Sequence, residues 1–183
     1  MPSALIPDGF GVTWVSHRGD LVETTLWPEG PRQAVLLPGE HTLPSGAEPP
    51  SGALDGWLYE PDPAVIRARA VGSLAELLQA RAVHPGIAYL SAPQFRQTPF
   101  ATAFEVLDVL AFEERTLRAW VREHQIGVLE IKVRGLDVDP AVLRRRLKPK
   151  GSASATLVLT PTGAGARALV VRRRTQGDSV APA

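Results

Sequence analysis

The chain of 183 residues is 44% hydrophobic and 21% charged, and it contains no cysteine. The lack of cysteine excludes a disulfide framework, a thiolate metal site and a cysteine nucleophile. The formal net charge of +1 is divided unevenly, because residues 1–100 hold six basic and ten acidic side chains and residues 101–183 hold fourteen and nine. A basic carboxy-terminal half favours a polyanionic partner.

Neither a targeting signal nor a membrane span is predicted. The amino-terminal residues have no basic flank of the kind that opens a secretory signal, and no apolar run reaches the length that a bilayer requires. We therefore expect a soluble, cytoplasmic protein that has no membrane partner. The length is that of one domain with a short additional arm.

The first elements are predicted to be strands. Two β-prone runs, at about 12–17 and 20–27, flank the tight turn Arg18-Gly19, and a third run at 33–37 is expected to pair with them. Residues 38–56 are rich in Pro, Gly and Ser. This composition predicts a flexible linker or a long surface loop.

Two Asp-Pro pairs predict helix starts, because Asp is a good amino-terminal cap and Pro a good first helical residue. Asp62-Pro63 opens a helix expected to reach about residue 81, with Gly72 as the place where it would break. Asp139-Pro140 opens a short helix with Leu143 and Leu147 on its apolar face. The other predicted elements are strands at 87–90, 103–111, 128–133, 154–160 and 166–173, a helix at 113–124, and a disordered tail at 175–183. This order predicts an α+β domain with a mixed α/β sheet.

Six short motifs, in this order along the chain, resemble the THUMP-like domain found at the carboxy terminus of bacterial class I SAM-dependent methyltransferases. The motifs are Leu58–Asp62, His84-Pro85, Pro99-Phe100, Phe104–Leu107, Leu129–Lys132 and Leu143–Leu147. The resemblance also implies that the β-hairpin before the linker corresponds to the last antiparallel strands of the methyltransferase sheet. The implied division is residues 1–37 for the hairpin segment, 38–56 for the linker, 57–174 for the THUMP-like domain and 175–183 for the tail.

The resemblance implies a role in recognising the substrate of a methyltransferase. SAM is implied as the cofactor of the complete enzyme, whose catalytic domain would lie upstream or on a separate chain. The sequence has no resemblance to the glycine-rich turn that cradles SAM, nor to the Asp/Asn-Pro-Pro loop of many base methyltransferases. We therefore expect that this chain binds no cofactor and has no catalytic residue of its own.

The histidines do not suggest a catalytic or metal site. They are His17, His41, His84 and His124, which are far apart in the sequence and lack the spacing of metal ligands. In the motif Glu60-Pro61-Asp62, one interpretation has Tyr59 and Glu60 facing a substrate. The interpretation that we favour is structural, with Asp62 capping a helix on which Tyr59 packs.

A cluster of basic residues is the strongest candidate site in the sequence. We expect its members to form one surface that contacts the phosphates of RNA: Lys132, Arg134, Arg144, Arg145, Arg146, Lys148 and Lys150. Because only 6% of the residues are aromatic, recognition of structured RNA by its shape is expected rather than stacking on bases. The simpler alternative is a solvated basic face whose cations stabilise the end of a helix.

A second function from a different class stays open. The chain could be a protein-interaction or dimerisation module, in which Trp14, Trp27 and Trp57 mark an exposed apolar surface.

Overall fold

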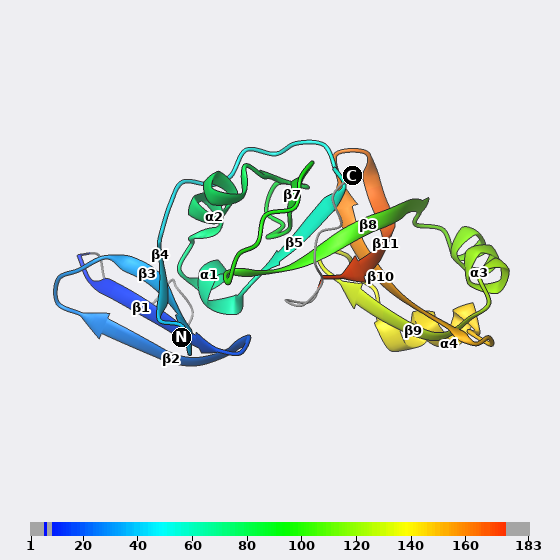
Figure 1. Ribbon diagram of the computed structural model, residues 1–183, viewed down its shortest axis with the longest axis horizontal. Helices are drawn as coiled ribbons and strands as arrows, with labels where there is room; N and C mark the ends of the chain where they lie inside the picture. The colour runs from blue at the N-terminus through cyan, green and yellow to red at the C-terminus, as the bar shows by residue number, and fades with distance from the viewer. Residues whose placement is uncertain (1–5, 7–8, 175–183) are drawn as a thin grey trace.

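The computed structural model describes residue 6 and residues 9–174, and within them the chain forms two β-sheets with four helices (Figure 1). The four-stranded sheet, drawn in blue, has the order β2-β1-β3-β4, and the seven-stranded sheet has the order β6-β7-β5-β8-β11-β10-β9. The tail predicted at residues 175–183 lies outside the described residues. In the described part, no helix has the length and apolar character that crossing a membrane requires.

The amino-terminal strands agree with the prediction. The four-stranded sheet consists of β1 Gly11–His17, β2 Asp20–Trp27, β3 Arg32–Leu37 and β4 His41–Pro44. Arg18 and Gly19 form the turn between β1 and β2, both with positive φ, as a tight hairpin turn requires. β1 pairs antiparallel with β2 and parallel with β3.

The segment predicted as a linker, residues 38–56, is fixed to both sheets. β4 lies within it and pairs with β3. The backbone N–H of Gly52 then donates to the Ala82 carbonyl at 2.9 Å. The sequence did not indicate β4, because a strand of four residues is too short to show an alternating pattern.

The seven-stranded sheet is mixed, as expected. Its strands are β5 Trp57–Pro61, β6 Arg81–Ala82, β7 Leu90–Ala92, β8 Ala101–Ala111, β9 Ile126–Val133, β10 Ala153–Thr162 and β11 Gly165–Arg173. Its helices are α3 Glu114–Glu123 and α4 Pro140–Leu147. β9 and β10 pair in parallel, with α4 between them in the chain, and the other pairs are antiparallel.

The helix predicted from residue 62 to about 81 is two helices, α1 Pro63–Arg67 and α2 Val71–Leu78. The chain turns at Arg69, which has φ +54°, and not at Gly72. A Cβ on Gly72 would lie 1.6 Å from the carbonyl oxygen of Ala47, so this glycine allows close packing of the segment after β4. The strand expected at 87–90 is also displaced, because β7 begins only at Leu90.

Helix α1 is shared between the two sheets. Its buried residues Ala64 and Val65 belong to one apolar cluster with Trp14 of the four-stranded sheet and Tyr59 of the seven-stranded sheet. A second cluster joins α3 and α4 to β9, β10 and β11. Trp14 is only 2% exposed, so it does not belong to an exposed apolar surface as the interaction alternative supposed.

Candidate functional site

A cleft of about 1340 Å³ lies between the two sheets. Its lining comes from the β1–β2 turn, the end of β3, α1 and the ends of β5 and β11. The charged residues in the lining are mostly cations: Arg18, Arg67, Arg69, Arg134, Arg173 and Arg174, against the carboxylates Glu60 and Asp62. The cleft is therefore basic.

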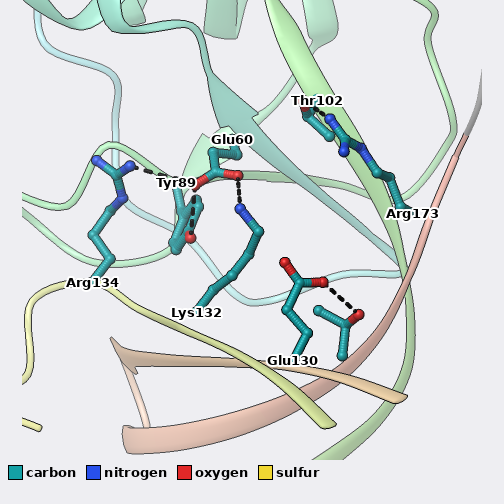
Figure 2. Close-up of polar contacts among 8 residues, drawn as sticks. Glu60, Tyr89, Thr102, Glu130, Lys132, Arg134 and Arg173 are labelled. Carbon is teal, nitrogen blue, oxygen red and sulfur yellow. Dashed lines mark hydrogen bonds and ion pairs between the residues drawn. The ribbon is translucent and has the colours of Figure 1, made fainter. Parts of the chain in front are cut away.

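Glu60 is the centre of a polar cluster at the edge of this cleft (Figure 2). One carboxylate oxygen, Oε2, lies 2.7 Å from Lys132 Nζ, and the other, Oε1, lies 3.5 Å from Arg134 Nη2. The Tyr89 hydroxyl donates a hydrogen bond to Oε1 at 3.3 Å. One carboxylate on β5 thus holds two cations from the end of β9.

The position of Arg134 depends on its neighbours in the fold. Its guanidinium lies 5.1 Å from the centre of the Tyr89 ring. The next residue, Gly135, has φ +74°, and a Cβ there would lie 2.2 Å from Ile87 Cδ1. Glycine therefore lets the chain after β9 approach the Ile87–Tyr89 segment closely.

The two tyrosines of the chain both resist ionisation. Burial raises the pKa of Tyr89 to about 12, and the negative charge of Glu60 raises it as well, against a smaller opposing effect of Arg134. Burial also raises the pKa of Tyr59. This hydroxyl donates to the Arg96 carbonyl and accepts from the Arg96 backbone N–H at 2.7 Å.

The motif Glu60-Pro61-Asp62 agrees with the structural interpretation, and that Glu60 faces a substrate stays a prediction. Asp62 caps α1, since its Oδ1 accepts from the Ala64 N–H at 2.8 Å. Tyr59 is fully buried in the core. Glu60 nevertheless faces the cleft, and neighbouring residues on a strand point to opposite faces of a sheet.

The predicted basic residues do not form one surface. Ile131 packs in the cluster that contains Leu143 and Leu147 of α4. Because side chains alternate along a strand, Lys132 points to the face opposite α4. Lys132 and Arg134 are therefore separated from Arg144, Arg145, Arg146, Lys148 and Lys150, which lie on α4 or just after it. That any of the seven binds RNA stays a prediction.

The end of α4 is organised by its own contacts. Asp139 caps the helix and accepts from the backbone N–H groups of Ala141 and Val142, and these hydrogen bonds lower the pKa of Asp139. Arg146 is 3.7 Å from Glu114 of α3. The Arg118 guanidinium donates to the Arg146 carbonyl at 2.8 Å. Arg144, Arg145, Lys148 and Lys150 are exposed to solvent.

Most of the cleft arginines were missed by the sequence reasoning. Arg18, Arg67 and Arg69 belong to the acidic half of the chain, where the count of charges suggested no basic surface. The sequence holds no local signal for them, because only the fold brings the turn after β1 next to α1 and the end of β11.

Comparison with known proteins identifies relatives of this chain. Residues 101–173, from the start of β8 to the end of β11, match the family described as THUMP domain-like. The matched part, called the THUMP-like domain below, contains β8–β11 with α3 and α4, and the α4 cations and Lys132 belong to it.

Two curated relatives are uncharacterised SAM-dependent methyltransferases from strains CDC 1551 / Oshkosh and H37Rv of Mycobacterium tuberculosis. Each is 38% identical over 162 residues, which cover 82% of this chain and 44% of the relative. The chain thus spans less than half the length of the relatives that it matches.

The fold also resembles a solved structure, that of a candidate methyltransferase from Porphyromonas gingivalis W83. The TM-score is 0.73 at 20% sequence identity, over 92% of this chain and 46% of that chain. The likeness includes the four-stranded sheet as well as the THUMP-like domain, since nearly the whole chain is covered.

In residues 6 and 9–174, no group of three or more His, Cys, Asp or Glu side chains is placed to hold a metal ion. His124 caps α3, and its ring stacks on Trp120 with 4.5 Å between the ring centres.

Proposed function

We propose that this chain is the carboxy-terminal, substrate-recognising portion of a SAM-dependent methyltransferase, that it holds an RNA substrate, and that it works in the cytoplasm. The observation that carries the proposal is the 38% identity to SAM-dependent methyltransferases across 82% of the chain. The THUMP-like domain and the basic carboxy-terminal half favour RNA as the substrate.

The described residues do not fit SAM. Sites for such cofactors in α/β folds use a glycine-rich turn between a strand and the helix of a βαβ unit. The βαβ unit formed by β9, α4 and β10 has the connection Arg134–Asp139, in which Gly135 is the only glycine. Methyl transfer would therefore need the part of the relatives that this chain does not match.

Strand β2 supports an attachment to a further sheet. It is an edge strand, and its adjacent residues Leu26 and Trp27 are 36% and 48% exposed. Because adjacent residues point to opposite faces, both faces of β2 present apolar groups. Such a strand is typical of the interior of an α/β sheet, which is covered on both faces. The methyltransferase part is the partner that we propose for this edge.

Binding of a labelled RNA stem-loop to the 183-residue chain tests the proposal. Fluorescence anisotropy at several salt concentrations should give saturable binding with a log-log slope of several units, because each phosphate contact contributes roughly 0.7 to 0.9. Calorimetry with SAM should show no saturable heat. Absence of salt-dependent RNA binding would contradict the RNA proposal. Tight SAM binding would contradict the proposal that the cofactor binds outside this chain.

The exposed edge of β2 also favours the second candidate, a dimerisation module. An edge strand with apolar side chains can pair with the same strand of a second copy. Sedimentation equilibrium separates the two candidates. A stable dimer that binds no RNA would support dimerisation as the main role.

A further inference from the structure

We propose that the cleft between the two sheets is the channel in which the phosphate backbone of the RNA lies. The inference rests on the proposed function and names the surface that performs it. It differs from the sequence-based prediction, which placed the contacts on α4 and the end of β9.

The charge of the cleft is not neutralised from within. Of its two carboxylates, Glu60 is held by Lys132 and Arg134, and Asp62 accepts the hydrogen bond that caps α1. Arg18, Arg67, Arg69 and Arg173 are exposed, and none of them forms an ion pair with a carboxylate in the part of the chain that the structure describes. A negatively charged polymer is the complement of such a surface.

The arginines lie on both sides of the cleft. Arg18 comes from the four-stranded sheet, whereas Arg134 and Arg173 come from the seven-stranded sheet. Figure 2 shows Arg173 beside Thr102, which is paired across the sheet with Glu60. A backbone in the cleft would therefore meet cations from two directions.

The size of the cleft suits a polymer better than a small ligand. Pockets for small molecules usually have volumes of roughly 300 to 1,000 Å³, and this cleft has about 1340 Å³. Its lining is also poor in surfaces for stacking bases. Phe95 is already engaged, with the Trp57 ring 4.8 Å away and the Arg174 guanidinium 5.5 Å away. The cleft is therefore suited to contact the phosphate backbone of the RNA rather than its bases.

The position of the cleft agrees with a role in presenting substrate. β1 and β3 run parallel, and the paired residues Ser16 and Leu36 near their carboxyl ends line the cleft. In open α/β sheets, ligands bind outside the carboxyl ends of the strands. If the methyltransferase part extends this sheet from β2, RNA in the cleft lies along the same edge as the reaction.

The test compares double variants of equal charge change in the 183-residue chain, with a labelled RNA stem-loop as the probe. The cleft variant is Arg67→Gln with Arg173→Gln, and the matched control is Arg115→Gln with Arg122→Gln, two exposed positions of α3. We expect the cleft variant to lose at least about tenfold in affinity and about 1.4 to 1.8 units of salt slope, since two phosphate contacts are removed. The control should change affinity less than about twofold, because distant exposed charges are screened.

Three results would overturn the proposal while leaving RNA binding itself intact. They are equal affinity in the wild type and the cleft variant, equal losses in cleft variant and control, or a loss confined to Arg144→Gln with Arg145→Gln on α4. The last result would restore the sequence-based surface. A wild-type chain that binds no RNA would instead contradict the proposed function. If the cleft variant unfolds at a lower temperature than the wild type, Arg18→Asn takes its place in the test. Asn tolerates the positive φ of this turn position.

Discussion

Glu60 brings together two cations and a phenol that come from distant parts of the sequence. It faces Lys132, Arg134 and the Tyr89 hydroxyl. Its own side chain is 20% exposed, so the ion pairs are partly shielded from solvent and are worth more than exposed pairs. Glu60 also reduces the positive charge of the cleft on the side where Arg134 lies.

The substitution Glu60→Gln should lower the pKa of Tyr89 from its value of about 12, because the negative charge of Glu60 helps to raise it. Tyr59 serves as the internal control, since burial and contacts with Arg96 determine its pKa. Absorbance titration can follow both, as the chain has only two tyrosines. An unchanged Tyr89 titration would show that burial alone sets its pKa.

Tyr89 also makes the stability of the protein depend on pH. The folded-state pKa of Tyr89 lies above the ordinary value of 10, so the folded protein binds the proton more tightly than the unfolded chain. The free energy of unfolding should therefore fall as the pH rises from about 10 to about 12. The fall should be smaller in Glu60→Gln.

At the residue scale, the sequence predicted what depends on local chemistry. Asp62 and Asp139 cap their helices as expected, because a cap is made with the next two or three residues. The pairing of Glu60 with Lys132 could not be predicted, since 72 residues separate them. Nor could it be seen that Lys132 and the α4 arginines point to different faces.

Strand β2 is an edge strand with exposed apolar side chains. Val22 is 58% exposed and is the additional residue at the irregularity where β2 pairs with β1. The substitution Val22→Lys should lower self-association of the chain at high concentration, because a charge on an edge strand opposes pairing. Stability should change by no more than about 0.5 kcal/mol, as for most surface positions.

The matched control is Val128→Lys, at a residue 67% exposed on β9, the edge strand of the other sheet. Sedimentation velocity of both variants is the measurement. If Val128→Lys lowers self-association as much as Val22→Lys does, the β2 edge has no special role in association.

Elements with clear periodicity were predicted well, and short elements were not. The long strands β8, β10 and β11 and the helix α3 lie within a few residues of their predicted bounds. β4, β6 and β7 have two to four residues each, so their positions depend on their partners in the sheet. The break before α2 depends on Arg69 adopting a positive φ, which no residue pattern indicated.

At the scale of the whole molecule, the two sheets share one core. The apolar cluster around α1 contains Trp14 and Leu36 from one sheet and Tyr59 and Leu90 from the other. We therefore expect a single cooperative unfolding transition in scanning calorimetry. This expectation replaces that of a flexible linker between an arm and a separate body.

A shorter chain beginning at residue 57 tests this. It would expose the side of α1 that packs on β1 and β3. Burial of a side chain such as Val65 contributes roughly 1.5 to 3 kcal/mol, so the midpoint of thermal unfolding should fall by about 10 °C. A fragment as stable as the full chain, or two separate transitions in the full chain, would show that the sheets are independent.

Helix α1 also bears on how such a protein can be inherited. A recombination event that moved only residues 57–174 to another protein would expose Ala64, Val65 and Ala68 to solvent on the side that β1 and β3 now cover. An event that moved β1–β4 as well would carry the whole core and both sides of the cleft. We therefore expect the heritable unit to begin before β1, so that β1–β4 and the residues that follow them pass from gene to gene together.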